Sequence, residues 1–274
     1  MDAIITHPAF QSGIAPFLVA LGVALLLRPL SNPWKSIGLM AGFGVSVYLV
    51  VGWQLLPLTS TRKIFIIAAL LTLLGVLLDL YPALRDRLLH GVVAAGVVSV
   101  VWVIWPLLQR QEDDRWWPIA GAALLFSTLL TGSLRRLKRD NGSLSVALCG
   151  VALGLSGAAL MGASLLYAQL AAALCGGAAA YLLLSLWHDF DGAGEVLLLP
   201  STALLALIAV AAVLFAQVPW YSLLPLLTIP LLVSLPLPLS WATWQERAAQ
   251  LGLVVLPITL TIVMVWSVEG SPPL

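Results

Sequence analysis

Long stretches without a single Lys, Arg, Asp or Glu dominate the chain. They are Ala3–Leu27, Ser36–Thr61, Ile64–Leu78, Leu88–Gln109, Trp116–Leu134, Asn141–His188, Val196–Gln245 and Ala248–Val268. A helix rises about 1.5 Å per residue, so crossing a hydrocarbon core of about 30 Å takes about 20 residues. Most of these windows therefore predict one membrane-spanning helix each.

Two windows are too long for one crossing, and each predicts a pair of spans. We expect the window 141–188 to fold back near Met161–Ser164, and the window 196–245 near Gln217–Pro219. The runs are apolar on every face, whereas barrel strands alternate apolar and polar residues. The pattern thus predicts an all-α integral membrane protein of about ten transmembrane helices with short loops.

The composition agrees with a membrane protein. Of 274 residues, 61% are hydrophobic and only 9% are charged, against about a quarter charged in soluble domains. These values exclude a soluble enzyme, a nucleic-acid-binding domain and a disordered chain. We therefore expect the lipid bilayer as the main partner, with other membrane subunits as further partners and no nucleic acid.

The net charge of +1 hides a division of the chain. Residues 1–140 hold 12 basic and 7 acidic residues, which gives +5, and residues 141–274 hold 1 and 5, which gives −4. With ten spans, nine basic residues fall on one side of the membrane and four on the other. The positive-inside rule then predicts that both termini are outside. We expect an integral protein of a cell membrane, such as the bacterial inner membrane.

The chain is expected to form one polytopic domain with two halves, 1–140 and 141–274. Five spans in each half would place the halves in opposite orientations. Inverted repeats of this kind are common in transporters, which bind substrate where the repeats meet. The alternative is two unrelated runs of hydrophobic helices.

Small residues form a stripe on the sixth span. Gly150, Gly154, Gly157 and Gly162 recur at helical spacing, and such stripes let helix backbones approach closely in lipid. We interpret them as packing positions in a tight hairpin between spans 6 and 7. The alternative is a permeation path lined by small residues.

The ninth span is rich in proline. Pro225 and Pro230 lie inside it, and each interior proline removes a backbone hydrogen bond, so the span must be kinked or broken. Broken helices often mark substrate sites in transporters. Candidate substrate-binding residues are therefore Pro225, Pro230 and Thr228, together with the midspan residues Gln54 and Gln169.

Few charged residues lie near the membrane interior. Asp79 ends the third span, with His90 on the same side, and the two are candidates for an ion pair or a proton relay. A second candidate ion pair would join the two halves. Asp189 and Asp191 follow the seventh span, and a salt bridge to Arg135 and Arg136 would fix the halves to each other on the basic side.

The sequence offers no arrangement that predicts catalysis, a metal or a cofactor. Three histidines, His7, His90 and His188, are scattered, and Cys149 and Cys175 form no CxxC pair. Residues 154–157 match the Gly-x-Ser-Gly pattern around the nucleophile of rhomboid-type proteases. However, His188 would lie at a different membrane depth from Ser156. We expect no enzyme.

Two functions compete on this sequence. The first is a multi-pass transporter or permease, and the uncharged interior restricts its substrate to a neutral, apolar or lipid-like small molecule. The alternative is a non-catalytic integral membrane subunit or scaffold of a larger membrane complex. A kinked cavity lined by both halves would favour the permease, and a packed core with a large partner-facing surface would favour the subunit.

Overall fold

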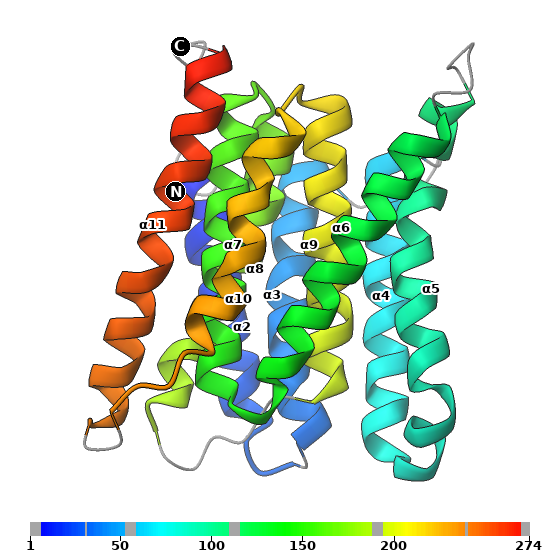
Figure 1. Ribbon diagram of the computed structural model, residues 1–274. Coiled ribbons are helices and arrows are strands. Elements are labelled where there is room, and N and C mark those ends of the chain that lie inside the picture. Colours follow the sequence, from blue (N-terminus) through cyan, green and yellow to red (C-terminus); the bar gives the residue numbers. More distant parts are fainter. Residues whose placement is uncertain are drawn as a thin grey trace.

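The computed structural model describes residues 7–30, 32–52, 59–109, 116–187, 194–238 and 241–269. Within these ranges the fold is entirely helical (Figure 1). The elements in chain order are η1 (Phe10–Ile14), α2 (Ala15–Leu26), α3 (Asn32–Val51), α4 (Ser60–Leu80), α5 (Pro82–Leu108), α6 (Trp116–Arg136), η2 (Leu137–Arg139), α7 (Asn141–Met161), α8 (Leu165–Ser185), α9 (Glu195–Phe215), η3 (Trp220–Thr228), α10 (Ile229–Val233) and α11 (Thr243–Glu269).

The predicted fold class is confirmed. Eight helices of the described chain are long and apolar enough to cross a membrane, and two further apolar segments, Phe10–Leu26 and Trp220–Val233, are shorter. Both expected fold-back points are turns. Ala163 lies between α7 and α8, and Gln217 lies between α9 and η3, with φ angles of 60° and 55°. These left-handed conformations reverse the chain within a few residues.

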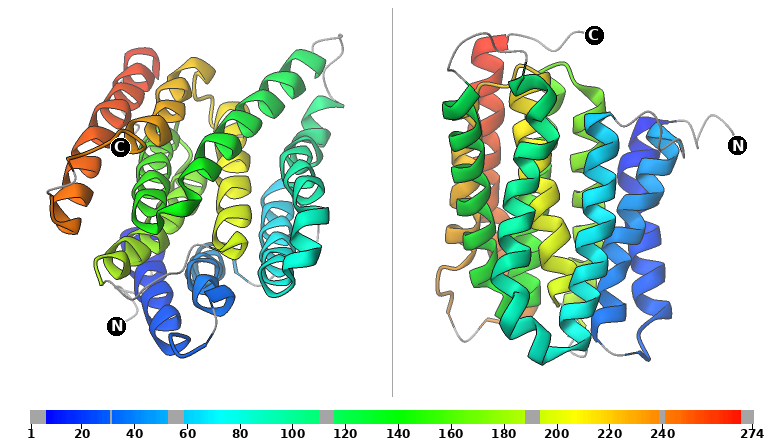
Figure 2. Two further views of the ribbon diagram at one scale, coloured as in Figure 1. Left: turned by 60° about the horizontal axis from the view of Figure 1, so that its bottom comes forward. Right: turned by 90° about the vertical axis from the view of Figure 1, so that its right-hand side faces the viewer.

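One helix forms the centre of the bundle. Of the α9 span, 94% is buried, compared with 72% for α7, 67% for α8 and 28–39% for the other long spans. Helices α3 to α8 all contact α9. The two ends of the described chain lie toward the same side of the bundle (Figure 2).

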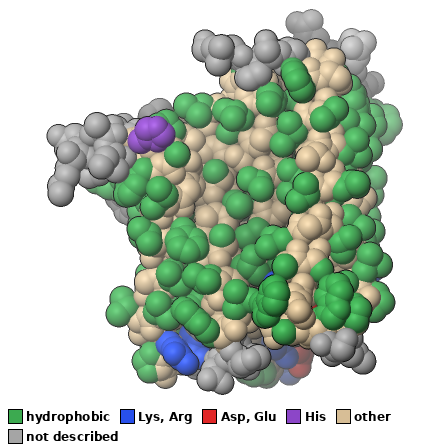
Figure 3. All heavy atoms as spheres, turned by 90° about the vertical axis from the view of Figure 1, so that its left-hand side faces the viewer, with side chains coloured by type: hydrophobic (Ala, Val, Ile, Leu, Met, Phe, Trp, Pro, Cys, Tyr) green, Lys and Arg blue, Asp and Glu red, His purple; other side chains and the backbone are tan. Residues whose placement is uncertain are grey.

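The outside of the bundle has the surface expected of a protein in lipid. The face drawn in Figure 3 is apolar over most of its height, with Lys and Arg side chains in its lower part and a His side chain near its upper left edge. Large apolar side chains are exposed, such as Leu256 at 69% and Leu26 at 78%. Tryptophans near the ends of the long helices, such as Trp117 at 62% and Trp244 at 63%, are exposed as well, as in the aromatic belts of membrane proteins.

The packing of the two halves is partly symmetric. Helix α4 packs along α9 and α3 along α8, so segments in corresponding positions of the halves are paired. However, α2 also packs along α8, whereas α3 and α7 share no comparable contact, so a two-fold axis does not explain the whole arrangement. The last segments differ, because α11 packs along α7 of its own half, whereas α6 packs along α9 of the other half. This difference leaves α6 to cross the bundle obliquely (Figure 1).

Candidate functional site

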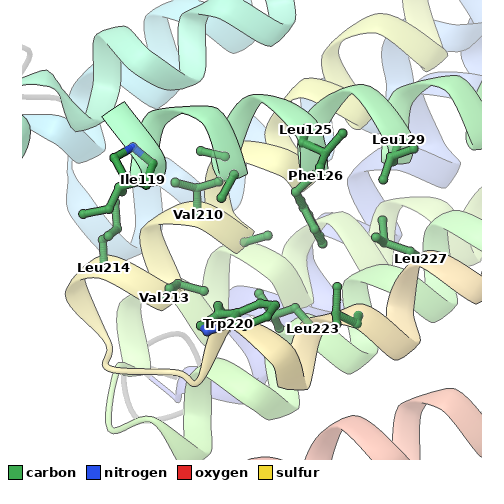
Figure 4. Close-up of a pocket in the computed structure, with 15 residues that line it drawn as sticks. Ile119, Leu125, Phe126, Leu129, Val210, Val213, Leu214, Trp220, Leu223 and Leu227 are labelled. Carbon is green, nitrogen blue, oxygen red and sulfur yellow. The ribbon is translucent and has the colours of Figure 1, made fainter. Parts of the chain in front are cut away.

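An apolar groove lies between α6, α9 and η3 (Figure 4). It encloses about 430 Å³, within the range of about 300–1,000 Å³ that is usual for small-molecule pockets. Helix α6 contributes side chains from Pro118 to Leu129, α9 from Ala209 to Leu214, and η3 from Trp220 to Leu227. Apart from the indole N–H of Trp220, every lining side chain consists of carbon and hydrogen only.

The unusual conformation of η3 shapes one wall of the groove. Nine consecutive residues form a 3₁₀-helix, although such runs rarely exceed four residues. At three residues per turn, Leu224 and Leu227 lie in one row along the helix, and Trp220 and Leu223 lie in the next. All four line the groove. The break that the prolines predict is therefore present as η3. It directs the apolar side chains of these four residues toward α6.

None of the predicted substrate-binding residues that the structure describes lines the groove, although Pro225 and Thr228 belong to η3, which forms one of its walls. Pro225 is half-buried in η3, and the exposed Thr228 donates its hydroxyl to the Pro225 carbonyl at 2.7 Å. Pro230 is buried at the start of α10. Gln169 is buried on α8, and Gln54 lies outside the described residues. The sequence indicates the broken segment but not the α6 and α9 walls, because their residues are ordinary for any buried helix.

A buried carboxylate joins the two halves at the start of α9. Glu195 is 1% exposed and accepts hydrogen bonds from the Arg135 guanidinium at 3.2 and 3.3 Å and from Lys138 Nζ at 2.6 Å. The N-terminal end of a helix also favours negative charge. The predicted partners Asp189 and Asp191 lie outside the described residues, and Arg136 is exposed. In the sequence, Glu195 could have been recognised as an acidic residue that directly precedes a long apolar stretch.

Asp79 lies at the same end of α9. Its Oδ2 accepts a hydrogen bond from the backbone N–H of Val196 at 3.1 Å, so a residue of α4 caps a helix of the other half. The helices meet closely here, because a Cβ on Gly75 would lie 2.7 Å from Val196 Cα. His90, the other candidate for an ion pair or relay, is exposed on α5.

A second ion pair fixes α7 to α11. Arg247 is 8% exposed, and its two amino groups contact the Asp140 carboxylate at 2.7 and 2.9 Å. Ser143 and Gln250 complete the network. Burial alone would raise the pKa of Asp140, but hydrogen bonds from Ser143 and Arg247 and the charge of Arg247 outweigh it and lower this pKa.

The glycine stripe of α7 faces η3, α10 and α11, and not the α8 helix of the expected hairpin. A Cβ on Gly150 would lie 2.2 Å from Val254 Cγ1, and one on Gly154 would lie 2.4 Å from Leu226 Cδ2. Gly157 meets Ile262 of α11, and Gly162 meets the Ala216 carbonyl. Helices α7 and α8 do pack along each other, but this stripe does not form their contact.

The remaining candidates have structural contacts. Ser156 of the Gly-x-Ser-Gly sequence donates its hydroxyl to the Ala168 carbonyl at 2.9 Å and so links α7 to α8. Cys149 and Cys175 are free thiols in the described chain, and the Cys149 thiol points to the Cys175 carbonyl at 3.6 Å. Within the described ranges, His, Cys, Asp and Glu do not gather in groups of three or more.

Comparisons with known proteins assign no family. No family model matches the chain, and no curated protein sequence matches it either.

Proposed function

We propose that this chain is a multi-pass membrane permease for a neutral, apolar or lipid-like small molecule, and that the groove between α6, α9 and η3 binds the substrate. The observation that carries the proposal is the groove itself, with its volume of about 430 Å³ and its hydrocarbon lining. A charged or strongly polar substrate would lose its hydration there without gaining partners, whereas an apolar one would not.

The position of the groove supports the same function. Its walls come from both halves, α6 from the first and α9 with η3 from the second. One wall is a broken segment, as in many transporters. Helix α6 is held to α9 by charged groups only at its end, through Arg135 and the following Lys138. At its other end, where the groove lies, α6 faces α9 with apolar side chains.

A second function, a non-catalytic subunit of a membrane complex, is favoured by a different observation. The central helix α9 is packed tightly along its length, with 94% of its span buried. Transporters that move polar substrates need a polar path through this region, whereas a scaffold does not. The permease proposal therefore covers substrates whose apolar part binds the groove and whose headgroup, where there is one, carries no net charge.

The test is lipid translocation in a purified system. The protein is reconstituted into phosphatidylcholine vesicles with a fluorescent neutral glycolipid, NBD-glucosylceramide, and dithionite is added to quench the outer leaflet. We expect the protected inner-leaflet fluorescence to disappear faster with the protein than without it. NBD-phosphatidylglycerol, which carries a charge, is the comparison and should stay protected.

A matched pair of variants relates the activity to the groove. Ala122 and Ala94 are both exposed alanines on helices, but only Ala122 lines the groove. Ala122→Phe should abolish translocation, and Ala94→Phe should leave it unchanged. Equal rates in vesicles with and without protein, together with a second protein that co-purifies at fixed stoichiometry, would overturn the permease in favour of the subunit.

A further inference from the structure

We infer that the groove holds a single hydrocarbon chain of a lipid, inserted from the leaflet on the side where α6 begins, with the polar head of the lipid beside Trp220. The inference rests on the proposed function, because it names the part of the substrate that the groove binds and the direction from which it enters.

The length of the groove matches one leaflet. Its α6 wall runs from Pro118 to Leu129, which spans about 16 Å at the rise of a helix. Half of the hydrocarbon core is about 15 Å thick. A lipid chain that enters at one membrane surface therefore fills the groove and ends near the midplane.

The width of the groove selects a slender occupant. An accessible volume of about 430 Å³ over a length of about 16 Å gives an average cross-section of only about 27 Å². One hydrocarbon chain fits this shape, and its surface needs no hydrogen-bond partner, which agrees with walls that supply almost none.

The two ends of the groove differ. Ile119 and Leu214 lie at one end, Trp220 lies between that end and the middle, and Leu129 and Leu227 lie at the other end (Figure 4). Trp220 is 66% exposed and packs edge-on against Tyr221. Rings of this kind prefer the membrane interface, where an indole N–H has polar neighbours. The end nearer to Trp220 is therefore the entrance, and the Trp220 N–H is available to the ester or headgroup oxygens of a lipid.

The inner end of the groove points toward the end of α6 that is fixed to α9. Beyond Leu129, the chain continues to Arg135 and Lys138, which bind the buried Glu195 of α9. These ion pairs hold α6 against α9 on the basic side of the bundle. The groove therefore lies in the leaflet on the side where α6 begins, and a substrate that crosses the membrane must leave this position toward the basic side.

Photo-cross-linking in vesicles tests both the occupant and its direction. The protein is reconstituted into phosphatidylcholine vesicles that contain one of two phosphatidylcholine probes, with a diazirine either at the end of an acyl chain or close to the glycerol. After irradiation, peptide mass spectrometry locates the labels. The chain-end probe should label Leu129 and Leu227, and the glycerol-side probe should label Trp117 and Trp220.

Ala122→Phe should remove the labels at Leu129 and Leu227, while labels at Leu256 on the lipid-facing side of α11 remain as the internal reference. If the chain-end probe labels Trp220 instead, the inferred direction of insertion of the lipid chain is wrong. Absence of label from the groove, or cross-links between two protein chains there, would overturn the occupant. If labelling is as expected but glycolipid translocation is absent, the chain site stands and the permease function fails.

Discussion

The carboxylate of Glu195 and the ammonium group of Lys138 lie 2.6 Å apart at the point where the two halves of the protein meet. The glutamate is 1% exposed, while the lysine side chain keeps 27% of its surface exposed. The pair is therefore asymmetric. The cation reaches water without its partner, but the carboxylate is buried and depends on the lysine and on Arg135.

This asymmetry predicts unequal effects of removing the two sides. The double variant Arg135→Ala, Lys138→Ala leaves a buried carboxylate unpaired and should lower the free energy of unfolding by about 3–5 kcal/mol. Glu195→Gln leaves two cations that reach water and should cost less, about 1–2 kcal/mol. Thermal unfolding in mild detergent measures both. Arg136→Ala, at an exposed neighbour, is the control. Equal losses on both sides would contradict the asymmetry.

The lowered pKa of Asp140 predicts a loss of stability in acid. A carboxyl whose pKa is lower in the folded protein stabilises it fully above the ordinary pKa of about 3.9. This contribution disappears as the pH falls from about 4 through the lowered pKa of the folded state. Melting temperatures of the wild type and of Asp140→Asn should therefore differ at pH 6, and the difference should shrink as the pH falls below about 4. A constant difference over this range would exclude the Asp140–Arg247 pair as its cause.

The close approach of α7 and α11 predicts that Gly150 tolerates no side chain. In Gly150→Ala the new methyl group would lie 2.2 Å from Cγ1 of Val254, a side chain that is 2% exposed and therefore surrounded by other groups. We expect a loss of about 1–3 kcal/mol from overpacking. Gly252→Ala on α11 is the matched control, because nothing lies within 4 Å of its Cβ position, and the higher helix propensity of alanine should leave stability unchanged or raised. Equal melting temperatures for the two variants would refute the packing role.

Asp79 caps α9 through one carboxylate oxygen. We therefore predict that the stability of the protein depends on this acceptor oxygen more than on the charge of the side chain. Asp79→Asn keeps an acceptor for the Val196 N–H and should retain near wild-type stability, since asparagine caps helices as well as aspartate does. Asp79→Leu removes the acceptor and should cost about 1–2 kcal/mol.

The Asp79→Asn variant also distinguishes a capping role of Asp79 from a role as a proton relay. Glycolipid translocation measured at pH 6 and pH 8 should show the same pH dependence in Asp79→Asn and in the wild type. If Asp79→Asn abolishes that dependence and unfolds like the wild type, Asp79 is a relay residue.

Much of the fold was predictable because the bilayer restricts the solutions. Every backbone group must be paired within the membrane, so long apolar windows have to be helices, and their lengths fix their number. The turns at Ala163 and Gln217 were found by the same arithmetic, because no helix can continue straight for 48 residues through a core of about 30 Å. The prolines likewise predicted a break near Pro225, because their rings are incompatible with a regular helix.

Which helices pack against one another could not be predicted in this way. In lipid, apolar side chains have little preference among apolar neighbours, so helix pairing depends on shape complementarity at sites such as Gly150 and Val254. The sequence therefore determined an all-helical membrane protein with a broken ninth segment and an uncharged interior. Only the tertiary structure decided that Glu195 joins the halves and that α6, α9 and η3 enclose a groove, because these features depend on which helix surfaces meet.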